Sequence, residues 1–439
     1  MSGSLTKPAQ SSSAPGGGEI VVVGGGAAGY FAAIAAAEAD PGARVTIFER
    51  TGTVLAKVRV SGGGRCNVTH ACFDPRELSG RYPRGGRALI GLFSRFGPRE
   101  TIEWFRERGV ELKTEADGRM FPVTDSSATI VEALEEAARR SGVRVERSTG
   151  VAGIVRAAGG KLELVLAGGG RRACDRLVWA GGGAKAGRHP LEDIGHAITL
   201  PVPSLFTFRV ELSWLGGLSG VSVDPVCVSV AGTKQTQTGP LLITHAGVSG
   251  PAVLRLSAWG ARDLHERSYQ FELHVHWLPG YALEEVVAEI QRRRQREGGQ
   301  RVEKARWGPL PGRLWERLVA SAGIAAGTSW SKLPRDQATR LAGVLTRTVL
   351  PVTGKSLNKE EFVTCGGIPL AEVELPRMES RVAPGVFLAG EALDIDGITG
   401  GFNFQAAWTT GWLAGRSAAE ACAAVPEPVE AGLPGVSPP

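Results

Sequence analysis

Three segments near the start of the chain carry the clearest hydrophobic pattern. Residues 20–23 are an uninterrupted apolar run, residues 45–48 are a second run that only Thr46 interrupts, and the alanine-rich residues 27–39 lie between them. A short, β-branched run bounded by glycines is typical of a buried parallel strand, and the segment between the two runs is long enough for a helix. The pattern therefore predicts a strand, a helix and a second parallel strand, in the order of a βαβ unit.

The turn between the first strand and the helix has the glycine spacing of a dinucleotide-binding site. Gly24, Gly26 and Gly29 follow the first strand, and Glu49 ends the second. The first glycine permits a tight turn, the second a close approach of the pyrophosphate, and the third close helix packing. The helix N-terminus would face the phosphates, and the Glu49 carboxylate would accept hydrogen bonds from the adenosine ribose. A glycine-rich turn in another α/β protein is the alternative interpretation.

The chain after this unit alternates between loop-like and regular patterns. Residues 51–99 are rich in glycine, arginine and turn residues and predict a long loop, and loops of this length are usually functional. Helical patterns follow at residues 99–108 and 128–141. Strand-like runs occur at residues 144–147, 152–156, 162–166 and 176–179, the last of which leads into Ala180 and three glycines. We expect this last strand to return to the same sheet and ligand.

A change of pattern at about residue 202 predicts an inserted domain. Short strands at 206–211, 226–230 and 269–276 are broken by turns such as 231–239, and helical periodicity takes over from residue 282 to about 350. Strand signals return at 361–364 and 385–388, before a final helix from about Asn403. The predicted divisions are a disordered tail (1–18), a Rossmann-like domain in two parts (19–201 and 354–424), an inserted β domain (202–280), a helical insertion that returns to the β domain (281–353) and a second disordered tail (425–439).

Composition narrows the classes of protein to which the chain can belong. Its 439 residues, 43% of them hydrophobic, allow two or three domains with a large buried core. Six cysteines without a C-x-x-C pair argue against a disulfide framework, a zinc site or a dithiol centre, and we expect no metal. The apolar residues 21–37 are interrupted by glycines and fit the βαβ unit better than a membrane span. Because no signal-peptide core is visible, we expect a cytoplasmic protein with no membrane partner.

The charge of the chain gives weak information about partners. The net charge of +6 at pH 7 is compatible with anionic ligands or nucleic acid. The densest basic run, residues 292–296, lies in a segment of helical character at residues 283–300, where a solvated charged face is the simpler interpretation. Arginines are dispersed along the chain and aromatic residues make up only 6% of it. The sequence therefore does not favour a nucleic-acid partner.

Two later segments predict that the bound dinucleotide is FAD. Residues 386–391 form an apolar strand that ends in Gly390 and Glu391, a pattern that in flavoproteins places an acid near the ribityl and pyrophosphate groups. Residues 400–405 then open an alanine-rich helix, whose N-terminus would stabilise negative charge on the pyrimidine edge of a reduced flavin. The alternative interpretation is a strand-end turn followed by an ordinary helix cap.

A glycine-rich loop at residues 57–69 is the third candidate for contact with the cofactor. It contains three consecutive glycines flanked by cations and hydrogen-bonding side chains. Glycine lets backbone N–H groups approach ligand oxygens, and Arg65 would face a pyrophosphate or an anionic substrate. Cys66 follows, but a lone cysteine beside glycines is more often a packed thiol than a nucleophile.

Several motifs together resemble the BaiN/YhiN-type bacterial flavoprotein family. They are SGGGRCNVT at residues 61–69, DGRMFP at 117–122, LITHAGVSGP at 242–251, and VTCGG at 363–367 followed by AGEALDIDG at 389–397. The likeness covers nearly all of the chain between its tails. It implies an α/β fold, with a discontinuous Rossmann-like FAD-binding domain, an inserted antiparallel β-barrel and a small helical subdomain. It also implies NAD(P)/FAD-dependent oxidoreductase activity.

The resemblance leaves the substrate open, because fold does not transfer it. One branch of the family resembles reductases of conjugated enones in oxidised bile acids, and others carry an aminoacetone-oxidase label. A departure at residues 184–190, where relatives have a Ser/Thr-rich turn, puts contacts there in doubt. The residues expected around FAD, from the motifs and the resemblance together, are Gly24, Gly26, Ala27, Ala28, Gly29, Glu49, Arg50, Lys57, Gly63, Gly64, Arg65, Cys66, Asn67, Val151, Ala180, Gly181, Gly182, Gly390, Glu391, Asp396, Gly400, Gly401, Asn403 and Phe404.

No catalytic acid stands out in the sequence. In a flavin reductase the isoalloxazine performs the hydride chemistry, and the protein positions the substrate, polarises its carbonyl group and supplies a proton. Tyr82, Arg119 and His245 have suitable chemistry. Each has a structural alternative, in which Tyr82 packs in a loop, Arg119 caps a turn and His245 is a satisfied histidine between strands.

The favoured function is a reductase that passes hydride through flavin N5 to a conjugated enone or a similar small-molecule substrate. No second full G-x-G-x-x-G follows a strand, so NADH or NADPH would be a transient reductant without a domain of its own. The alternatives are an oxidase of a small amine that uses O₂, a flavin-dependent RNA-modifying enzyme, and a sensor in which FAD is structural. The sequence leaves the oligomeric state open.

Overall fold

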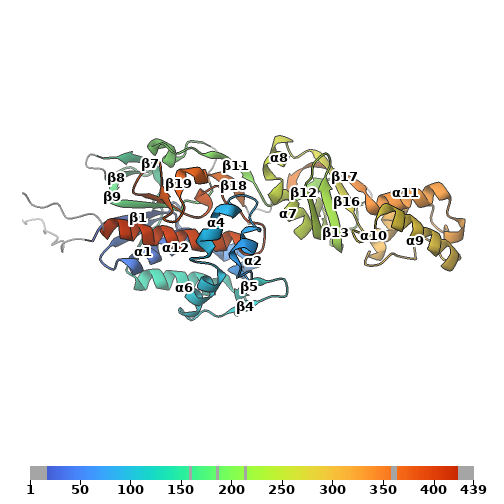
Figure 1. The fold of residues 1–439 in the computed structure, drawn as a ribbon, viewed down its shortest axis with the longest axis horizontal. Coiled ribbons are helices and arrows are strands. Elements are labelled where there is room, and N and C mark those ends of the chain that lie inside the picture. Colours follow the sequence, from blue (N-terminus) through green and yellow to red (C-terminus); the bar gives the residue numbers. More distant parts are fainter. Residues whose placement is uncertain (1–16, 158–160, 184–186, 212–214, 357–362, 424–439) are drawn as a thin grey trace, which may run out of the picture.

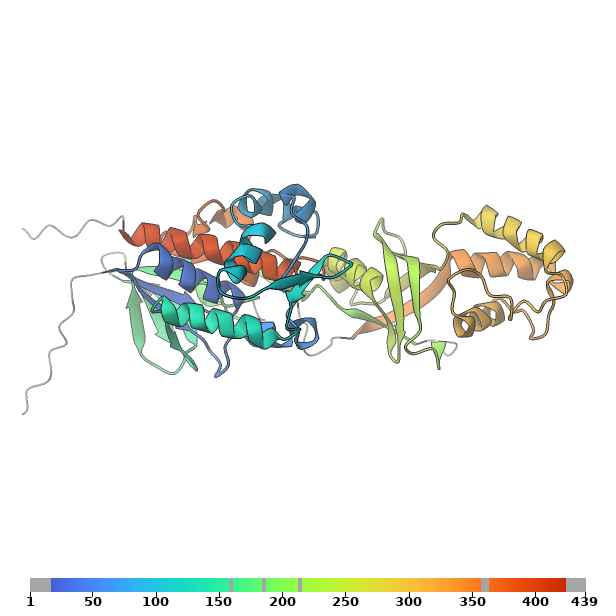
Figure 2. The same ribbon diagram turned by 90° about the horizontal axis from the view of Figure 1, so that it is seen from below.

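The computed structural model describes residues 17–157, 161–183, 187–211, 215–356 and 363–423. Within these ranges the chain forms an elongated molecule, with an α/β domain at one end, a β-barrel in the middle and a helical subdomain at the other end (Figure 1). The view from below shows the same order along the long axis (Figure 2). The tails predicted at 1–18 and 425–439 lie outside the described residues, apart from positions 17 and 18. No helix in the described ranges is long and apolar enough to cross a membrane.

A seven-stranded sheet forms the centre of the α/β domain, in the order β19-β20-β21-β10-β1-β2-β6. The five strands from β21 to β6 are parallel, and β19 and β20 add an antiparallel edge. Strands β1, β2, β10 and β21 are almost continuously buried, which explains why their sequences are mostly apolar instead of alternating. The bounds are β1 Glu19–Val23, β2 Arg44–Phe48, β6 Arg144–Glu146, β10 Arg176–Trp179, β19 Val373–Glu374, β20 Glu379–Ser380 and β21 Val386–Leu388.

Three long helices accompany this sheet. Helix α1 (Ala27–Ala39) packs against both α12 (Phe402–Ala423) and α6 (Ser127–Arg140). Ten consecutive residues of α1 are buried, and a helix that is apolar on all sides belongs in the interior of a domain. The bounds of α1 agree with the sequence prediction, and α12 begins one residue before the expected Asn403.

The prediction of a long loop over residues 51–99 is wrong in part. That segment contains helices α2 (Ala56–Gly64), α3 (Pro75–Ser79) and α4 (Gly86–Phe93), and α5 (Pro98–Arg106) begins at its end. Glycines obscured them, because α2 is kinked and has non-helical backbone angles at three of its positions. In α4 the buried side chains of Leu89, Leu92 and Phe93 form a short apolar stripe that the surrounding turn residues masked.

Two small sheets complete the α/β domain. Strands β3 (Thr69–His70), β5 (Arg119–Pro122) and β4 (Leu112–Thr114) form one. Strands β7 (Val151–Arg156), β8 (Leu162–Leu166) and β9 (Arg171–Cys174) form the other, and their apolar side chains join the same hydrophobic core as the main sheet. A 3-10 turn, η2 (Pro190–Ile194), packs against β7.

The barrel is closed by six antiparallel strands in the order β12-β15-β14-β13-β16-β17. Helices α7 (Pro251–Trp259) and α8 (Ala261–Glu266) follow β15. The turn predicted at 231–239 is too long, because the alternating Thr and Gln residues from Thr236 onward already belong to β14, as the strand preference of threonine allows. The bounds are β12 Thr207–Val210, β13 Ser222–Val230, β14 Thr236–Thr244, β15 Gly247–Ser249, β16 Phe271–His276 and β17 Thr348–Ser356.

The helical subdomain is inserted between β16 and β17 and shares the core of the barrel. It contains α9 (Leu283–Arg296), α10 (Gly312–Ser321), the 3-10 turn η4 (Trp330–Lys332) and α11 (Arg335–Thr346). Fully buried tryptophans lie in this common core. A shared core holds the subdomain in a fixed position on the barrel.

Two antiparallel strands connect the α/β domain to the barrel. The outgoing strand β11 (Thr199–Pro203) pairs with the returning strand β18 (Thr364–Gly367). Half of the strand predicted at 361–364 lies outside the described residues, and its last residue, Thr364, begins β18. Short 3-10 turns η5 (Leu370–Glu372) and η6 (Gly390–Ala392) follow in the returning chain. The predicted fold class, a Rossmann-like α/β domain with an inserted antiparallel barrel and a helical subdomain, is confirmed.

Candidate functional site

The turn after β1 is built so that only glycine fits at two positions. Gly24 has a φ of +109°, and a Cβ there would lie 2.3 Å from the carbonyl oxygen of Ala180. A Cβ at Gly29 would lie 1.8 Å from the carbonyl oxygen of Gly24. By contrast, a Cβ at Gly26 would meet no atom within 4 Å, because this residue faces open space. The backbone N–H groups at the start of α1, which no side chain caps, therefore border an open cavity.

Glu49 lies at the end of β2 and faces the same turn. Its carboxylate accepts hydrogen bonds of 2.8 Å from the backbone N–H of Gly25 and from the backbone N–H and hydroxyl of Thr51. Three donors fix the orientation of this carboxylate beside the first turn of α1. This is the position at which a βαβ unit presents an acid to a ribose.

A cavity of about 320 Å³ opens at this turn, and we call it the turn cavity. Segments far apart in the sequence meet around it, namely the βαβ turn, the start of α2, the end of β10, η6 and the start of α12. The expected cofactor residues that line it are Gly24, Gly26, Ala27, Ala28, Glu49, Arg50, Lys57, Ala180, Gly181, Gly182, Gly390, Glu391, Asn403 and Phe404.

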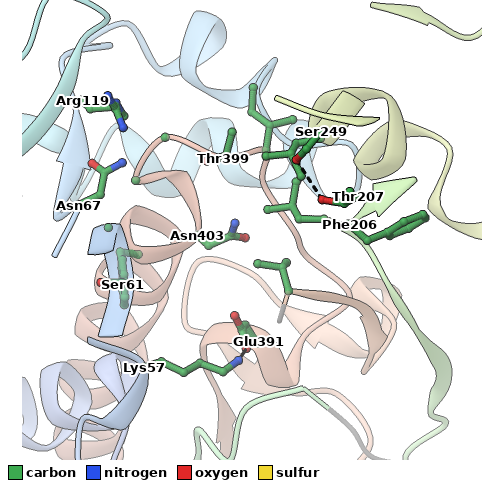
Figure 3. Close-up of a pocket in the computed structure, with 18 of the residues that line it drawn as sticks. Lys57, Ser61, Asn67, Arg119, Phe206, Thr207, Ser249, Glu391, Thr399 and Asn403 are labelled. Carbon is green, nitrogen blue, oxygen red and sulfur yellow. Dashed lines mark hydrogen bonds and ion pairs between the residues drawn. The ribbon is translucent and has the colours of Figure 1, made fainter. Parts of the chain in front are cut away.

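A second cavity of about 390 Å³, the barrel cavity, lies between the α/β domain and the barrel (Figure 3). The two cavities share Lys57, Glu391, Asn403 and Phe404, so they are neighbouring parts of one site. At their junction Lys57 Nζ forms an ion pair of 2.5 Å with the Glu391 carboxylate. Four further expected residues line the barrel cavity, namely Asn67, Gly400, Gly401 and the catalytic candidate Arg119.

The N-terminus of α12 borders the barrel cavity. Gly400 and Gly401 precede the helix with φ angles of +129° and +89°, which strongly favour glycine. Asn403 holds this turn closed, since its side-chain amide accepts from the Gly397 N–H at 2.8 Å and donates to the Gly397 carbonyl at 3.0 Å. The positive end of the helix dipole and its free N–H groups are thereby presented to the cavity.

Besides Lys57 at the junction, Arg119 is a second cation that the α/β domain contributes to the wall of the barrel cavity. It lies on β5, and its guanidinium contacts Asp117 at 2.7 Å and Glu115 at 3.0 Å. These two carboxylates hold the guanidinium in place. Across the cavity, the hydroxyl groups of Thr207 and Ser249 lie 2.9 Å apart on neighbouring barrel strands (Figure 3). The cavity therefore combines a cation, a helix N-terminus and a pair of hydroxyl groups.

Part of the expected glycine loop does not reach either cavity. Ser61, Gly62 and Asn67 line the barrel cavity, whereas Gly63 and Gly64 do not. Arg65 turns away to stack on Phe121, at 4.0 Å from the ring centroid, and to pair with Glu115 at 2.6 Å. In this structure Arg65 makes these two contacts and lines neither cavity.

Cys66 is a packed thiol, as the simpler interpretation of the sequence held. It is fully buried, and burial raises its pKa to about 12. A thiol with this pKa is protonated at neutral pH and is a poor nucleophile.

Three further expected cofactor residues lie elsewhere. Gly29 is buried inside the βαβ turn, and Val151 is in β7, away from both cavities. Asp396 is completely buried and forms an ion pair with Arg84 and a hydrogen bond with the Ser204 hydroxyl. The Asp396 carboxylate thus joins two domains and lines neither cavity.

Two of the three catalytic candidates are outside the site. Tyr82 is buried and donates a 2.6 Å hydrogen bond to the carbonyl oxygen of Phe402, and burial raises its pKa well above the usual value. It therefore supports the first turn of α12. His245 borders a separate cavity on the barrel, beside Arg209 and Glu211. Neither residue has the position of a proton donor to a ligand in the barrel cavity.

Sequence reasoning missed most of the barrel side of the site. No local motif marks these residues, which come from the linker, three barrel strands and α7. The alternation of apolar and polar residues that predicted the strand at 206–211 was the available signal for these residues, because it indicates which side chains share one face of a strand. Val58, Ser61 and Gly62 also line the cavities and belong to the expected loop 57–69, although they were not singled out. The lining residues that were not expected are Gly25, Thr51, Thr53, Leu55, Ala56 and Ala407 in the turn cavity, and Leu205, Phe206, Thr207, Ser249, Leu254, Ser356, Val363, Ile398 and Thr399 in the barrel cavity.

Residues 18–417 match the family described as HI0933-like protein Rossmann domain. The chain belongs to this family. It is 31% identical to the 3-dehydro-bile acid delta(4,6)-reductase of Clostridium scindens over 89% of this chain and 96% of that protein. It is also 28% and 27% identical to the ribosomal RNA dihydrouridine synthases of Escherichia coli and Haemophilus influenzae, over 84% and 87% of this chain and 91% and 94% of theirs. The resemblance noted in the sequence is confirmed, and the chain is a flavoprotein oxidoreductase.

Two solved structures have a partly similar course of the chain. A 3-ketosteroid delta1-dehydrogenase from Sterolibacterium denitrificans is 12% identical, with a TM-score of 0.47 and coverage of 92% of this chain and 99% of that one. A quinol fumarate reductase of Escherichia coli is 15% identical, also with a TM-score of 0.47, and coverage of 94% and 72%.

Proposed function

We propose that this protein is an FAD-dependent reductase that uses NADH or NADPH to reduce a carbon–carbon double bond conjugated with a carbonyl group. The observation that carries the proposal is the pair of adjoining cavities. One has the features of a dinucleotide site, and the other offers a cation and hydroxyl groups beside a helix N-terminus. The names of the bile acid reductase and of the dihydrouridine synthases both describe saturation of such a double bond.

The turn cavity fits the adenosine and pyrophosphate groups of FAD. The open space in front of Gly26 admits phosphate oxygens to the N-terminus of α1, and a Cβ at Gly182 would also meet no atom within 4 Å. Glu49 would accept hydrogen bonds from the adenosine ribose. Lys57 and Glu391, at the junction of the cavities, would face the middle of the cofactor. When bound, FAD supplies the hydride-carrying ring.

The residues of the barrel cavity would bind and polarise the substrate. The Arg119 guanidinium would hold the substrate carbonyl oxygen and stabilise the negative charge that develops on it. The hydroxyl groups of Thr207 and Ser249, hydrogen-bonded to each other, would deliver a proton to the substrate from the barrel side. The N-terminus of α12 would stabilise negative charge at the edge of the cavity nearest the α/β domain.

An anaerobic titration tests this function against the oxidase. The purified protein is reconstituted with FAD and mixed with NADH, then NADPH, while the flavin band at about 450 nm is followed. We expect bleaching by a pyridine nucleotide, and rapid recovery on addition of an enone steroid but slow recovery with O₂. If a small amine bleaches the flavin and O₂ restores it while both nucleotides leave it unchanged, the protein is an oxidase and the proposal fails. A protein that does not take up FAD contradicts the cofactor assignment.

A further inference from the structure

Strand β3 is fixed to the N-terminal part of α12 by close contacts. The Thr69 hydroxyl donates a buried hydrogen bond of 2.5 Å to the side chain of Gln405. A Cβ at Gly401 would lie 2.5 Å from the carbonyl oxygen of Thr69, so the strand also touches the turn that precedes the helix. The second residue of the strand, His70, is therefore held beside the helix N-terminus that borders the barrel cavity.

The position of the Arg119 guanidinium depends on the turn between β4 and β5. Both carboxylates that pair with it, Glu115 and Asp117, belong to this turn. Asp117 also accepts a hydrogen bond of 3.2 Å from the Arg119 backbone N–H, and Gly118 completes the turn with a φ of +88°. A displacement of this turn therefore displaces a cation in the wall of the barrel cavity.

The His70 ring lies between this turn and the helix. On one side its Nε2 is 3.0 Å from the carbonyl oxygen of Asp117, and a Cβ at Gly118 would lie 2.4 Å from its Cε1. On the other side the ring stacks on Phe402, the first residue of α12, with ring centroids 4.7 Å apart. His70 is also directly opposite Arg119 in the pairing of β3 with β5, so both side chains lie on the same face of that sheet. The ring thus sets the turn of Arg119 against the helix N-terminus.

The hydrogen bonds of His70 suit only its neutral form. A carbonyl oxygen accepts hydrogen bonds, so Nε2 carries the proton that it donates to Asp117. Among the described residues the buried Nδ1 has no hydrogen-bond partner, and a second proton there would find no acceptor. That proton would also place a positive charge beside the N-terminus of α12, where the helix dipole is positive.

The charged groups around the ring do not reverse this preference. Burial lowers the pKa of His70, and the nearby Arg81 lowers it further. The hydrogen bond to the Asp117 carbonyl and the carboxylates of Asp117 and Glu77 oppose this shift only in part. Arg119 is a further cation on β5, and the first four residues of α12 carry no charged side chain. The pKa therefore lies below the ordinary histidine value of about 6.5, and the ring gains a proton only in acid.

We propose that His70 is a positioning residue for the reduction of substrate, because its neutral ring holds the turn that carries Arg119 against the N-terminus of α12, and that protonation of the ring releases this turn. The inference rests on the proposed function and deepens it, since it makes the same site sensitive to pH. His70 itself lines neither cavity and acts through Asp117 and Arg119. After release, the guanidinium no longer has the fixed position from which it would stabilise charge on the substrate carbonyl oxygen.

Two substitutions separate the hold on the turn from the proton. His70→Phe keeps a ring that stacks but has no N–H, whereas His70→Gln keeps an N–H and gains no charge in acid. The FAD-loaded full chain is reduced with dithionite, and its reoxidation by an enone steroid is followed by stopped-flow absorbance from pH 5 to pH 8. At pH 8 we expect His70→Phe to lower the maximum rate about tenfold with little change in the half-saturating enone concentration, because a misplaced group costs rate. His70→Gln should recover most of this loss.

The pH profile identifies the titrating group. For the unaltered protein the maximum rate should fall as the pH drops below about 6.5, because the neutral ring that holds the turn is lost as the pH falls through the lowered pKa. This fall should be absent in His70→Gln. The exposed His265→Gln lies outside both cavities and should show the same fall as the unaltered protein. A fall that persists in His70→Gln, or a full rate in His70→Phe, overturns the proposal.

Hydrogen exchange tests the hold on the turn without any substrate. In the FAD-loaded full chain, amides of residues 115–120 and 398–405 should exchange at least about fivefold faster in His70→Phe than in the unaltered protein at pH 7. The unaltered protein should show the same increase at pH 5, after correction for the intrinsic effect of pH on exchange. Unchanged exchange in His70→Phe overturns the proposal. An unaltered protein that no enone reoxidises at any pH contradicts the proposed function instead, and the exchange rates still decide whether His70 holds the turn.

Discussion

Single residues determine how the two cavities differ in chemistry. The turn cavity is formed largely by backbone and small side chains, and Glu49 is the acid that hydrogen bonds fix beside the βαβ turn. The barrel cavity is formed largely by side chains, and Arg119 is held there by two carboxylates. A change of one side chain in the turn cavity should therefore impair cofactor binding, and a change of one side chain in the barrel cavity should impair substrate reduction.

Replacement of Arg119 should impair the reduction of substrate and leave the reduction of flavin intact. We expect Arg119→Ala to lower kcat/KM for the enone about 100-fold, which is typical when a donor to a developing oxyanion is removed. Arg119→Lys should recover only part of this loss, because lysine keeps the charge but lacks the planar fork. Stopped-flow absorbance measures the two half-reactions separately, with the exposed Arg87→Ala as control. A slower reduction of flavin by NADPH in Arg119→Ala would contradict this assignment.

Replacement of Glu49 should weaken FAD binding without changing substrate specificity. A hydrogen bond to a charged acceptor contributes about 1.5–3 kcal/mol, so we expect Glu49→Gln to raise the Kd for FAD roughly tenfold or more. Fluorescence of released flavin measures this constant. The exposed Glu132→Gln on α6 carries the same chemical change away from both cavities and should bind FAD normally. Equal affinities of the two variants would remove Glu49 from the cofactor site.

At the scale of elements, the contact between α1 and α12 aligns the two helix N-termini with the site. Gly411 and Gly415 of α12 lie directly against the backbone of α1. A Cβ at Gly411 would lie 2.4 Å from the carbonyl oxygen of Ala28, and one at Gly415 would lie 2.0 Å from that of Ala32. Small residues spaced by one helical turn thus bring the N-terminal and C-terminal parts of the domain together.

An added methyl group at this contact should destabilise the protein. We expect Gly411→Ala to lower the free energy of unfolding by about 1–3 kcal/mol, because backbone must move to admit the Cβ. Gly91→Ala on α4 is the matched control, since its Cβ would meet no atom within 4 Å. The control should gain about 0.4–1 kcal/mol from the lower entropy of the unfolded chain. Thermal unfolding measures both, and a stabilised Gly411→Ala would show that the helices are not in close contact.

At the scale of the whole molecule, one buried cluster joins the α/β domain to the inserted domain. Arg84 donates to Asp396, to the Ser204 hydroxyl at 3.0 Å and to the carbonyl oxygen of Ala258 at 2.8 Å. Asp396 is fully buried, and Ser204 and Ala258 belong to the chain that enters the barrel and to α7. The cluster thereby fixes the relative position of the two walls of the barrel cavity.

Loss of the Arg84 guanidinium from this cluster should lower the stability of the protein strongly. Arg84→Met leaves the Asp396 carboxylate buried without its partner, and we expect a loss of about 3–5 kcal/mol in the free energy of unfolding. The double variant Arg84→Met/Asp396→Asn should recover part of this loss, because no buried charge remains. Arg106→Met, which breaks an exposed pair with Glu103, should have no measurable effect. Denaturant unfolding gives all three values, and full stability of Arg84→Met would contradict the role of the cluster.

The sequence predicted local features of the fold well and long-range ones poorly. The βαβ unit and helix α1 were predicted because their signals lie within a few turns of chain. The helices between residues 56 and 93 were missed, since glycine and arginine hide their short apolar stripes. Within the site, the residues of the βαβ turn were expected. Thr207 and Ser249 were not, because hydroxyl residues on barrel strands carry no local signature.

The sequence by itself determined the class of the protein and of its cofactor, because glycine spacing and a following acid act through contacts between neighbouring segments of chain. Only the tertiary structure decided that Arg119 and two barrel hydroxyls line the same cavity, and that Asp396 is buried against Arg84. Such relations depend on the packing of elements hundreds of residues apart, which no local pattern of side chains encodes.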